Sequence, residues 1–450
     1  MIRSINPFSG EMLGEYSEMS LPEAHAVVER VAGAQAHWRN VPLNARCLLV
    51  KSLASILREK SHELSPVLTG EMGKPISQSR AEIEKCAWLC DYYADHFEEL
   101  LTPRVVDTDA SRSYVSYEPL GVVFGIMPWN YPFWQVFRFM IPALLSGNGV
   151  VLKHASNVTG SALMIHTILR QSGFPEDIMN VVIISGSKSS ELIANQHINA
   201  VTLTGSEGAG RAVASAAGKA IKPVVLELGG SNAFIVLDDA HIQSAVHDAI
   251  VGRFQNNGQS CIAAKRILLH TAIEDQFMAL FSKAVRELWV GNPLDESCYI
   301  GPLARPEFVD DLQDQVDRSV AAGAKLVVGG RSQGNMFSPT ILTGMKQGMA
   351  GFDEETFGPV ACVGTFNTLD EAIHLANATP YGLGVSIYTQ NTERIEPCIK
   401  HFKDGAVFVN SILKSDPRLP FGGTGISGFG RELGEEGALA FVNRKTVYFA

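Results

Sequence analysis

The sequence predicts an α/β protein built around parallel, doubly wound sheets, and three observations support this. A chain of 450 residues with 46% hydrophobic and 19% charged side chains can bury a large core and form two or three domains. From about residue 114 onwards, short β-rich apolar runs alternate with amphipathic segments, which is typical of such sheets. No internal repeat or low-complexity tract interrupts the alternation.

The first hundred residues are expected to be helical. Ser20, Pro22 and Glu23 match the sequence signature of a capping box, and apolar residues recur at helical spacing directly after it. Two further helices are predicted at about residues 46–69 and 76–100, where polar breaks separate amphipathic stretches. The uncharged stretch 119–137 contains three prolines, so we interpret it as a buried strand, a turn and a core helix rather than a membrane span.

Strands and helices then alternate in two blocks. The first block includes the strand sequences GVVFGIM, GVVLK, MNVVIIS, AVTLT and PVVLE. A second alternation after Asn232 predicts a second α/β domain, and the chain closes with FVNRKTVYFA, which has the pattern of an edge strand. Ligands of parallel sheets bind at the carboxyl ends of the strands, so the chemistry is expected there.

Composition excludes several classes of function. The net charge of −10 opposes binding to nucleic acid or to anionic membranes, and no basic run reverses it. Seven scattered cysteines without a C-x-x-C pair predict neither a disulfide framework nor a metal site. Reduced thiols and an N-terminus without a signal-peptide pattern lead us to expect a cytoplasmic protein without a metal.

Three side chains are candidates for catalysis. Cys261 follows a polar, glycine-containing stretch at an element boundary, where exposed backbone amides could stabilise a thiolate. Glu227 ends a predicted strand at the ligand edge of the sheet, and Asn130 stands in a turn fixed by two prolines. The structural alternatives are an inert thiol, a salt bridge and an Asx turn, respectively.

Two segments could bind an anion. Gly205 and Ser206 follow the strand AVTLT and lead into a helix, whose N-terminal amides would face a phosphate. The segment is not a P-loop, because Arg211 and Ala212 replace the required lysine and hydroxyl, and a plain strand-to-helix turn is the alternative. Lys153, at the end of GVVLK, could bind a phosphate or a ribose, or extend to water.

Six motifs in order resemble those of the aldehyde dehydrogenase superfamily along essentially the whole chain. They are PWN at 128–130, LTGS at 203–206, LELGG at 226–230, GQSC at 258–261, EETFGP at 354–359, and PFGG at 420–423 with SGFGREL at 427–433. The resemblance implies a Rossmann-type cofactor domain (1–100 and 120–229) and an α/β catalytic domain (230–426). It also implies a small β oligomerisation element (101–119 and 440–450) and a homodimer or homotetramer.

The resemblance also implies roles for individual residues. Cys261 would be the nucleophile, Asn130 and the Cys261 amide the oxyanion hole, and Glu227 the base that activates water. Glu432 matches a second acid that relays protons in some members. The expected cofactor contacts are Trp129, Lys153, Ser156, Gly205, Ser206, Glu355 and Phe357.

Among subfamilies, the chain is most similar to bacterial and cyanobacterial succinate semialdehyde dehydrogenases, through FWQVFRF, LKHASN, GQSCIAAKR and KSDPRLPFGG. In that resemblance Arg138, Ser260 and Ser415 would hold the distal carboxylate of the substrate, although an internal salt bridge is the alternative for Arg138. The expected reaction is the NAD(P)-dependent oxidation of a short, acid-bearing aldehyde.

Departures from the family pattern bear on the cofactor. Many members have an acid where Ser156 stands, and an acid would repel a 2′-phosphate, so Ser156 beside Lys153 favours NADP over NAD. His154, Gly425 and the pair Asn232-Ala233 also differ from the common residues. Other aldehyde specificities, an acyl-CoA-forming dehydrogenase, a non-redox thiol amidase or thioester hydrolase, and a binding protein without turnover remain as alternatives.

Overall fold

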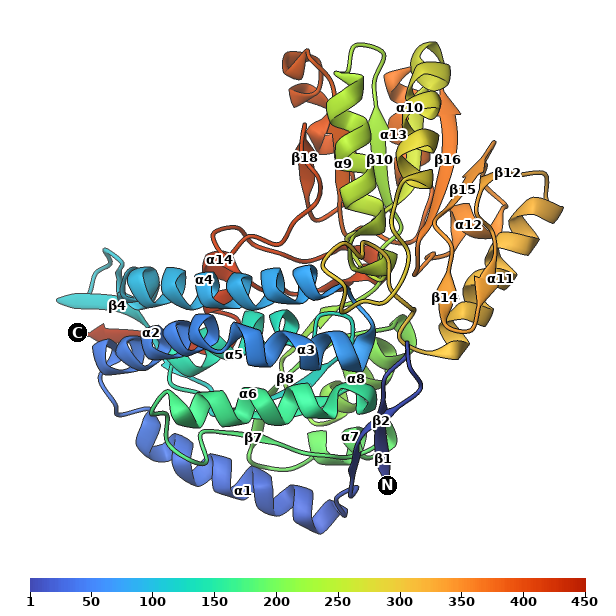
Figure 1. Ribbon diagram of the computed structural model, residues 1–450. Coiled ribbons are helices and arrows are strands. Elements are labelled where there is room, and N and C mark those ends of the chain that lie inside the picture. Colours follow the sequence, from blue (N-terminus) through green and yellow to red (C-terminus); the bar gives the residue numbers. More distant parts are fainter.

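Two sheets organise the molecule into two lobes, which the computed structural model describes over residues 1–450 (Figure 1). The first lobe is built on a six-stranded sheet with the order β19-β9-β8-β5-β6-β7, in which only β19 is antiparallel. Its strands are β5 (Val122–Met127), β6 (Gly149–His154), β7 (Met179–Val181), β8 (Ile198–Thr204), β9 (Val224–Glu227) and β19 (Gly428–Phe429).

Chain order reverses direction at the centre of this sheet. From β5 the chain moves outward through β6 to β7, and it then returns to the other side of β5 through β8 and β9. Such a reversal leaves a crevice at the carboxyl ends of β5 and β8, where ligands of doubly wound sheets bind. The MPWNYP turn follows β5, and the segment with Gly205 and Ser206 follows β8.

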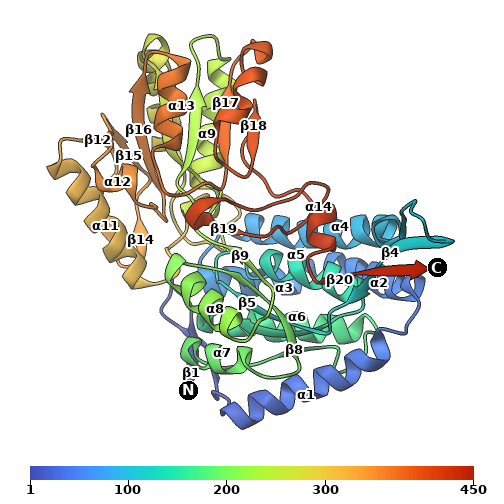
Figure 2. The same cartoon turned by 180° about the vertical axis from the view of Figure 1, so that it is seen from behind.

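Helices cover both faces of the first sheet, as Figures 1 and 2 show. Every residue of α5 is buried, which explains why this segment carries almost no charge. The helices of this lobe are α1 (Leu21–Trp38), α2 (Leu43–Glu59), α3 (Ser61–Met72), α4 (Ile76–Leu101), α5 (Trp134–Leu145), α6 (Thr159–Gln171), α7 (Gly186–Ile193) and α8 (Glu207–Lys219).

The second lobe is built on a seven-stranded sheet with the order β12-β15-β16-β11-β10-β17-β18, in which only β12 is antiparallel. Its strands are β10 (Asn232–Val236), β11 (Ala264–His270), β12 (Lys325–Val328), β15 (Thr340–Thr343), β16 (Val360–Phe366), β17 (Val385–Tyr388) and β18 (Val407–Val409). Its helices are α9 (Ile242–Phe254), α10 (Glu274–Arg286), α11 (Pro306–Ala321), α12 (Ala350–Asp353) and α13 (Leu369–Asn377).

A third, three-stranded sheet projects from the first lobe (Figures 1 and 2). The closing strand β20 (Val442–Phe449) pairs antiparallel with β4 (Arg112–Pro119), which also pairs with β3 (Arg104–Val105). The short helix α14 (Gly434–Ala438) precedes β20. The predicted closing strand is thus paired on one side, while the domain boundaries and the oligomerisation role remain predictions.

The N-terminal region differs from the sequence prediction in two places. The capping box at Ser20 is present, but an antiparallel hairpin of β1 (Ile2–Ile5) and β2 (Met12–Tyr16) precedes it, so the region is not wholly helical. The predicted helix 46–69 is two helices, because Lys60, with φ −95° and ψ 10°, leaves helical geometry between α2 and α3. Apolar periodicity continues across that break and does not reveal it.

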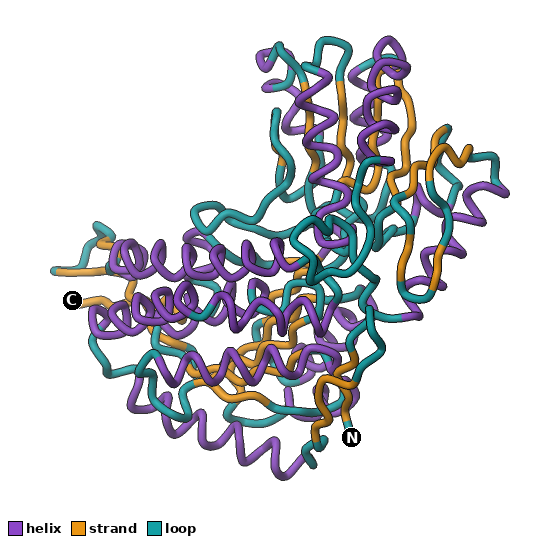
Figure 3. The backbone as a smooth tube through the Cα atoms, in the orientation of Figure 1, coloured by secondary structure: helices purple, strands orange, loops and turns teal.

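The chain trace in Figure 3 shows loops concentrated between the two lobes. Two small strands, β13 (Ser332–Gln333) and β14 (Met336–Phe337), form a hairpin in the second lobe. No helix combines the length and the apolar character needed to cross a lipid bilayer.

Candidate active site

A left-handed turn positions Cys261 between the lobes. After α9, Asn256 and Asn257 both have φ of 58°, and Gly258 follows with φ of 71°. A side chain at Gly258 would collide with the backbone of Gly358, so only glycine fits there. The asparagines tolerate this conformation better than most residues, and β11 begins at Ala264, three residues beyond Cys261.

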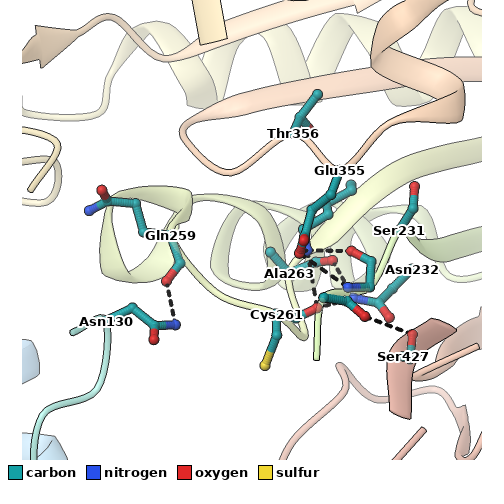
Figure 4. Close-up of polar contacts among 12 residues, drawn as sticks. Asn130, Ser231, Asn232, Gln259, Cys261, Ala263, Glu355, Thr356 and Ser427 are labelled. Atoms are coloured by element: carbon teal, nitrogen blue, oxygen red, sulfur yellow. Dashed lines mark hydrogen bonds and ion pairs between the residues drawn. The ribbon is translucent and has the colours of Figure 1, made fainter. Parts of the chain in front are cut away.

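Residues of the second lobe hold the backbone of Cys261. Its carbonyl oxygen accepts a 2.6 Å hydrogen bond from Asn232 Nδ2 and a 3.2 Å bond from Lys265 Nζ. Lys265 also pairs with Glu355. Figure 4 shows the sulfur pointing away from this network, so the backbone is fixed while the thiol is left free to react.

The side chain of Asn130 is also held in one orientation. Its Nδ2 donates to the Gln259 carbonyl at 3.1 Å (Figure 4). Its Oδ1 accepts from Gln135 Nε2 at 3.0 Å. Asn256 Nδ2 donates to both the Asn130 and the Gln259 carbonyls, at 3.0 and 2.9 Å. One amide proton of Asn130 thus lacks an acceptor, and this residue lines the same cavity as Cys261.

Two cavities meet at Cys261, which lines both of them together with Gln135. The first, here called the substrate cavity, has a volume of about 170 Å³ and contains the predicted residues Arg138, Ser260 and Ser415. The second, here called the cofactor cavity, has a volume of about 250 Å³. Pockets for drug-sized ligands measure roughly 300–1,000 Å³, so the substrate cavity suits a short molecule and the cofactor cavity can enclose only part of a dinucleotide.

The cofactor cavity contains most of the predicted cofactor residues. They are Trp129, Gly205, Ser206, Glu355 and Phe357. Ser206 caps α8, so the N-terminal amides of this 13-residue helix lie at the cavity and provide a partial positive charge for a phosphate. The Glu355 carboxylate accepts a hydrogen bond from the Gly230 amide at 3.1 Å. These groups fit a dinucleotide.

Lys153 and Ser156 lie at the end of β6, outside the lining of the cofactor cavity. Here Arg305, the residue before α11, reaches across from the second lobe. Its Nη2 donates to Ser156 Oγ at 2.9 Å and to Asn157 Oδ1 at 3.2 Å. Burial and the charge of Arg305 lower the pKa of Lys153, and neither cation has a carboxylate partner within 4.0 Å. Sequence reasoning missed Arg305.

Glu227 is buried at the end of β9, and neither of its carboxylate oxygens has a hydrogen-bond partner. Burial raises its pKa well above the usual value, and the nearby Glu432 raises it further. It lines neither cavity, although its charge acts on the pKa of Cys261. A buried, unsatisfied carboxyl group of this kind is a candidate for proton transfer.

Arg138 forms an ion pair with Glu432, with Nε 2.7 Å from Oε2, and both side chains are buried. Its role in binding a substrate carboxylate remains a prediction, because a carboxylate of the protein already neutralises it. Burial raises the pKa of the Cys261 thiol, an effect that Arg138 and Lys265 partly offset. The resting thiol is therefore neutral at pH 7, and attack on a carbonyl requires that its proton be removed.

The substrate cavity holds a residue that sequence reasoning missed. Lys85, on α4, donates from Nζ to Ser415 Oγ at 3.0 Å, and its Nζ lies 4.2 Å from the centre of the Trp134 ring. Ser260 lines the cavity beside Cys261, and its buried hydroxyl has no hydrogen-bond partner. No local sequence pattern marks Lys85, which lies in an ordinary amphipathic helix.

Comparisons with known proteins agree with this geometry. The model of the aldehyde dehydrogenase family matches residues 1–447. A probable NADP(+) succinate-semialdehyde dehydrogenase of Synechocystis is 46% identical, with 100% of both chains covered. The NAD(P)+ succinate semialdehyde dehydrogenase Sad of Escherichia coli is 39% identical, with 99% of this chain and 97% of that protein covered.

Solved structures give the same result. The succinic semialdehyde dehydrogenase of Streptococcus pyogenes, crystallised with NADP+, superposes with a TM-score of 0.97 at 34% identity, and both chains are covered completely. The predicted α/β fold, with a Rossmann-type sheet, is confirmed. This chain therefore belongs to the aldehyde dehydrogenase family, whose members are oxidoreductases.

Proposed function

We propose that the protein oxidises succinate semialdehyde, or a similar short acid-bearing aldehyde, to the carboxylate with NADP as the preferred cofactor. The observation that carries the proposal is the position of Cys261 at the meeting point of two cavities. One cavity is small and contains cationic side chains, and the other begins at the N-terminus of α8. The names of the relatives support the same substrate and cofactor.

Cys261 would act as the nucleophile. Its S–H proton passes to a water molecule in the cavity, and the sulfur then bonds to the aldehyde carbon. The negative charge that develops on the oxygen is stabilised by the free amide proton of Asn130 and by the Cys261 backbone N–H. Because Asn130 is already oriented by Gln135 and Gln259, this stabilisation needs no reorganisation during the reaction. When bound, NADP supplies the hydride acceptor.

Glu227 would remove a proton from the water that hydrolyses the thioester on Cys261. Its raised pKa makes the Glu227 carboxylate a stronger proton acceptor once it is ionised. Glu432, also with a raised pKa and adjacent to Arg138, would receive that proton in turn. In this arrangement Arg138 holds the second carboxyl group in place.

The preference for NADP would come from Lys153, Ser156 and Arg305. Arg305 donates to the Ser156 hydroxyl, and its charge also acts on the pKa of Lys153. Neither cation has a carboxylate partner, and such a group suits a 2′-phosphate. Trp129, Gly205, Ser206, Glu355 and Phe357 would hold the remainder of the dinucleotide.

The domain roles follow the same proposal. Residues 1–100 and 120–229 would form the cofactor domain, and residues 230–426 would form the catalytic domain. Segments 101–119 and 440–450 would join copies of the chain into a homodimer or homotetramer, because β20 and β4 form a projecting ribbon. We also propose that the enzyme acts in the cytoplasm, where its seven free cysteines would stay reduced.

Steady-state assays of several aldehydes with NADP and NAD test the proposal. We expect reduced nicotinamide to accumulate fastest with succinic semialdehyde and NADP. Faster turnover of an uncharged aldehyde would contradict the substrate, and a preference for NAD would contradict the cofactor. Ester or amide hydrolysis without any nicotinamide product would instead favour a thiol hydrolase.

A further inference from the structure

The substrate cavity has one sheltered cation whose charge no carboxylate of the protein compensates. Arg138 is paired with Glu432, whereas no carboxylate oxygen lies within 4.0 Å of Lys85 Nζ. Lys414 also lines the cavity, but it is exposed, so water screens its charge. Lys85 is half-buried beside the Trp134 ring, where its charge acts over a longer range.

The acids closest to Lys85 are already engaged. Glu82 pairs with the buried Lys74 and accepts backbone hydrogen bonds from Phe133 and Trp134 at 2.8 and 2.9 Å. Asp416 forms two hydrogen bonds with Arg418, at 2.8 and 2.7 Å. Both carboxylates are thus held away from the ammonium group, which leaves two of its three N–H donors without an acceptor.

The hydroxyl of Ser415 completes a receptor for an anion. Its oxygen accepts from Lys85 Nζ at 3.0 Å and from Trp134 Nε1 at 2.8 Å, so both of its lone pairs are occupied. The hydroxyl proton can then only be donated, and it has no acceptor in the protein. Two N–H donors and one O–H donor without acceptors therefore lie together in the cavity that contains Cys261.

From this arrangement we infer that Lys85 is the residue that selects substrates with a distal carboxylate, which it binds together with the Ser415 hydroxyl. Arg138 is then a positioning residue that neutralises Glu432, rather than the main carboxylate receptor. The inference rests on the proposed function and deepens it. A monocarboxylate fits because one ammonium and one hydroxyl match its two oxygens.

The test compares Lys85→Met, which keeps an unbranched side chain without the charge, with the wild type on succinic semialdehyde and on butanal. We expect KM for succinic semialdehyde to rise about 10- to 100-fold, while kcat changes little and kcat/KM for butanal is unchanged or higher. Lys85→Arg should recover part of the loss. Arg80→Met is the matched control, because it removes a cation from the same helix outside the cavity.

A second measurement does not depend on turnover. Succinate should protect Cys261 from alkylation by iodoacetamide in the wild type and in Arg80→Met but not in Lys85→Met, as followed by mass spectrometry of the Cys261 peptide. If Lys85→Met keeps the preference for succinic semialdehyde, or if succinate protects both or neither, the inference is overturned. A wild type that ignores succinic semialdehyde yet is protected by succinate through Lys85 would refute only the proposed substrate.

Discussion

The two cavities that meet at Cys261 differ in where their cations lie, but each is associated with both paired and unpaired cations. Arg138 lines the substrate cavity and is neutralised by Glu432, whereas Lys265 lies outside the lining of the cofactor cavity and is neutralised by Glu355, which does line it. Each cavity also has a cation nearby without such a partner, Arg305 on the cofactor side and Lys85 on the substrate side. Paired cations fix the geometry of the site, and unpaired cations are available for ligands.

The largest effect is expected from a substitution of Cys261, which lines both cavities. Cys261→Ala should reduce kcat by at least about 10³-fold, because no other thiol lines either cavity. NADP should still bind, since its contacts come from other residues, and this can be measured by isothermal titration. Residual turnover close to the wild-type rate would refute the assignment of the nucleophile.

Removing a paired cation should affect the fold more than it affects specificity. Arg138→Met leaves Glu432 buried without its ion-pair partner, so we expect the free energy of unfolding to fall by about 3–5 kcal/mol. Urea denaturation followed by circular dichroism measures this change. The free energy of unfolding of Lys85→Met, measured in the same way, should fall far less. Equal decreases for the two variants would contradict the distinction between paired and unpaired cations.

Removing the unpaired cation on the cofactor side should affect binding and leave the fold intact. Arg305→Met should raise KM for NADP about 10-fold, the size expected for the loss of one charged hydrogen bond to a phosphate. KM for NAD should stay the same, because NAD lacks the 2′-phosphate. Arg331→Met, which removes an exposed arginine elsewhere in the second lobe, serves as the control. A parallel rise for both dinucleotides would point to a structural role.

The smallest expected effect is a change of substrate selectivity with pH. Burial lowers the pKa of Lys85 to about 8, and the charge of Arg138 contributes to this shift. The nearby groups of Cys86, Glu82 and Asp416 act in the opposite direction and raise this pKa. Lys85 therefore loses its charge as the pH rises through that value, and selectivity for succinic semialdehyde over butanal should fall up to about tenfold between pH 7 and 9. The ratio of kcat/KM values cancels the titration of Cys261 itself. A constant ratio would mean that Lys85 does not bind the carboxylate.

The difference between residues inside and outside local motifs explains which parts of the site the sequence could predict. Cys261, Glu227 and Asn130 stand in local motifs at element boundaries, so their types and their context pointed to chemistry. Lys85 and Arg305 carry no local signal, because their partners are 330 and 149 residues away along the chain. The alternation of strands and helices predicted both sheets, whereas the break at Lys60 and the N-terminal hairpin depend on packing that periodicity does not contain.

The turn that carries Cys261 is fastened to both halves of the molecule. Asn256 and Asn257 donate from Nδ2 to the carbonyls of Asn130 and Gly73 in the first lobe, while Asn232 and Lys265 hold the Cys261 carbonyl from the second. Separation of the two lobes would break these hydrogen bonds before either sheet unfolds. During gradual denaturation, enzyme activity should therefore be lost before the sheets unfold. Activity is thus a sensitive measure of the contact between the two lobes.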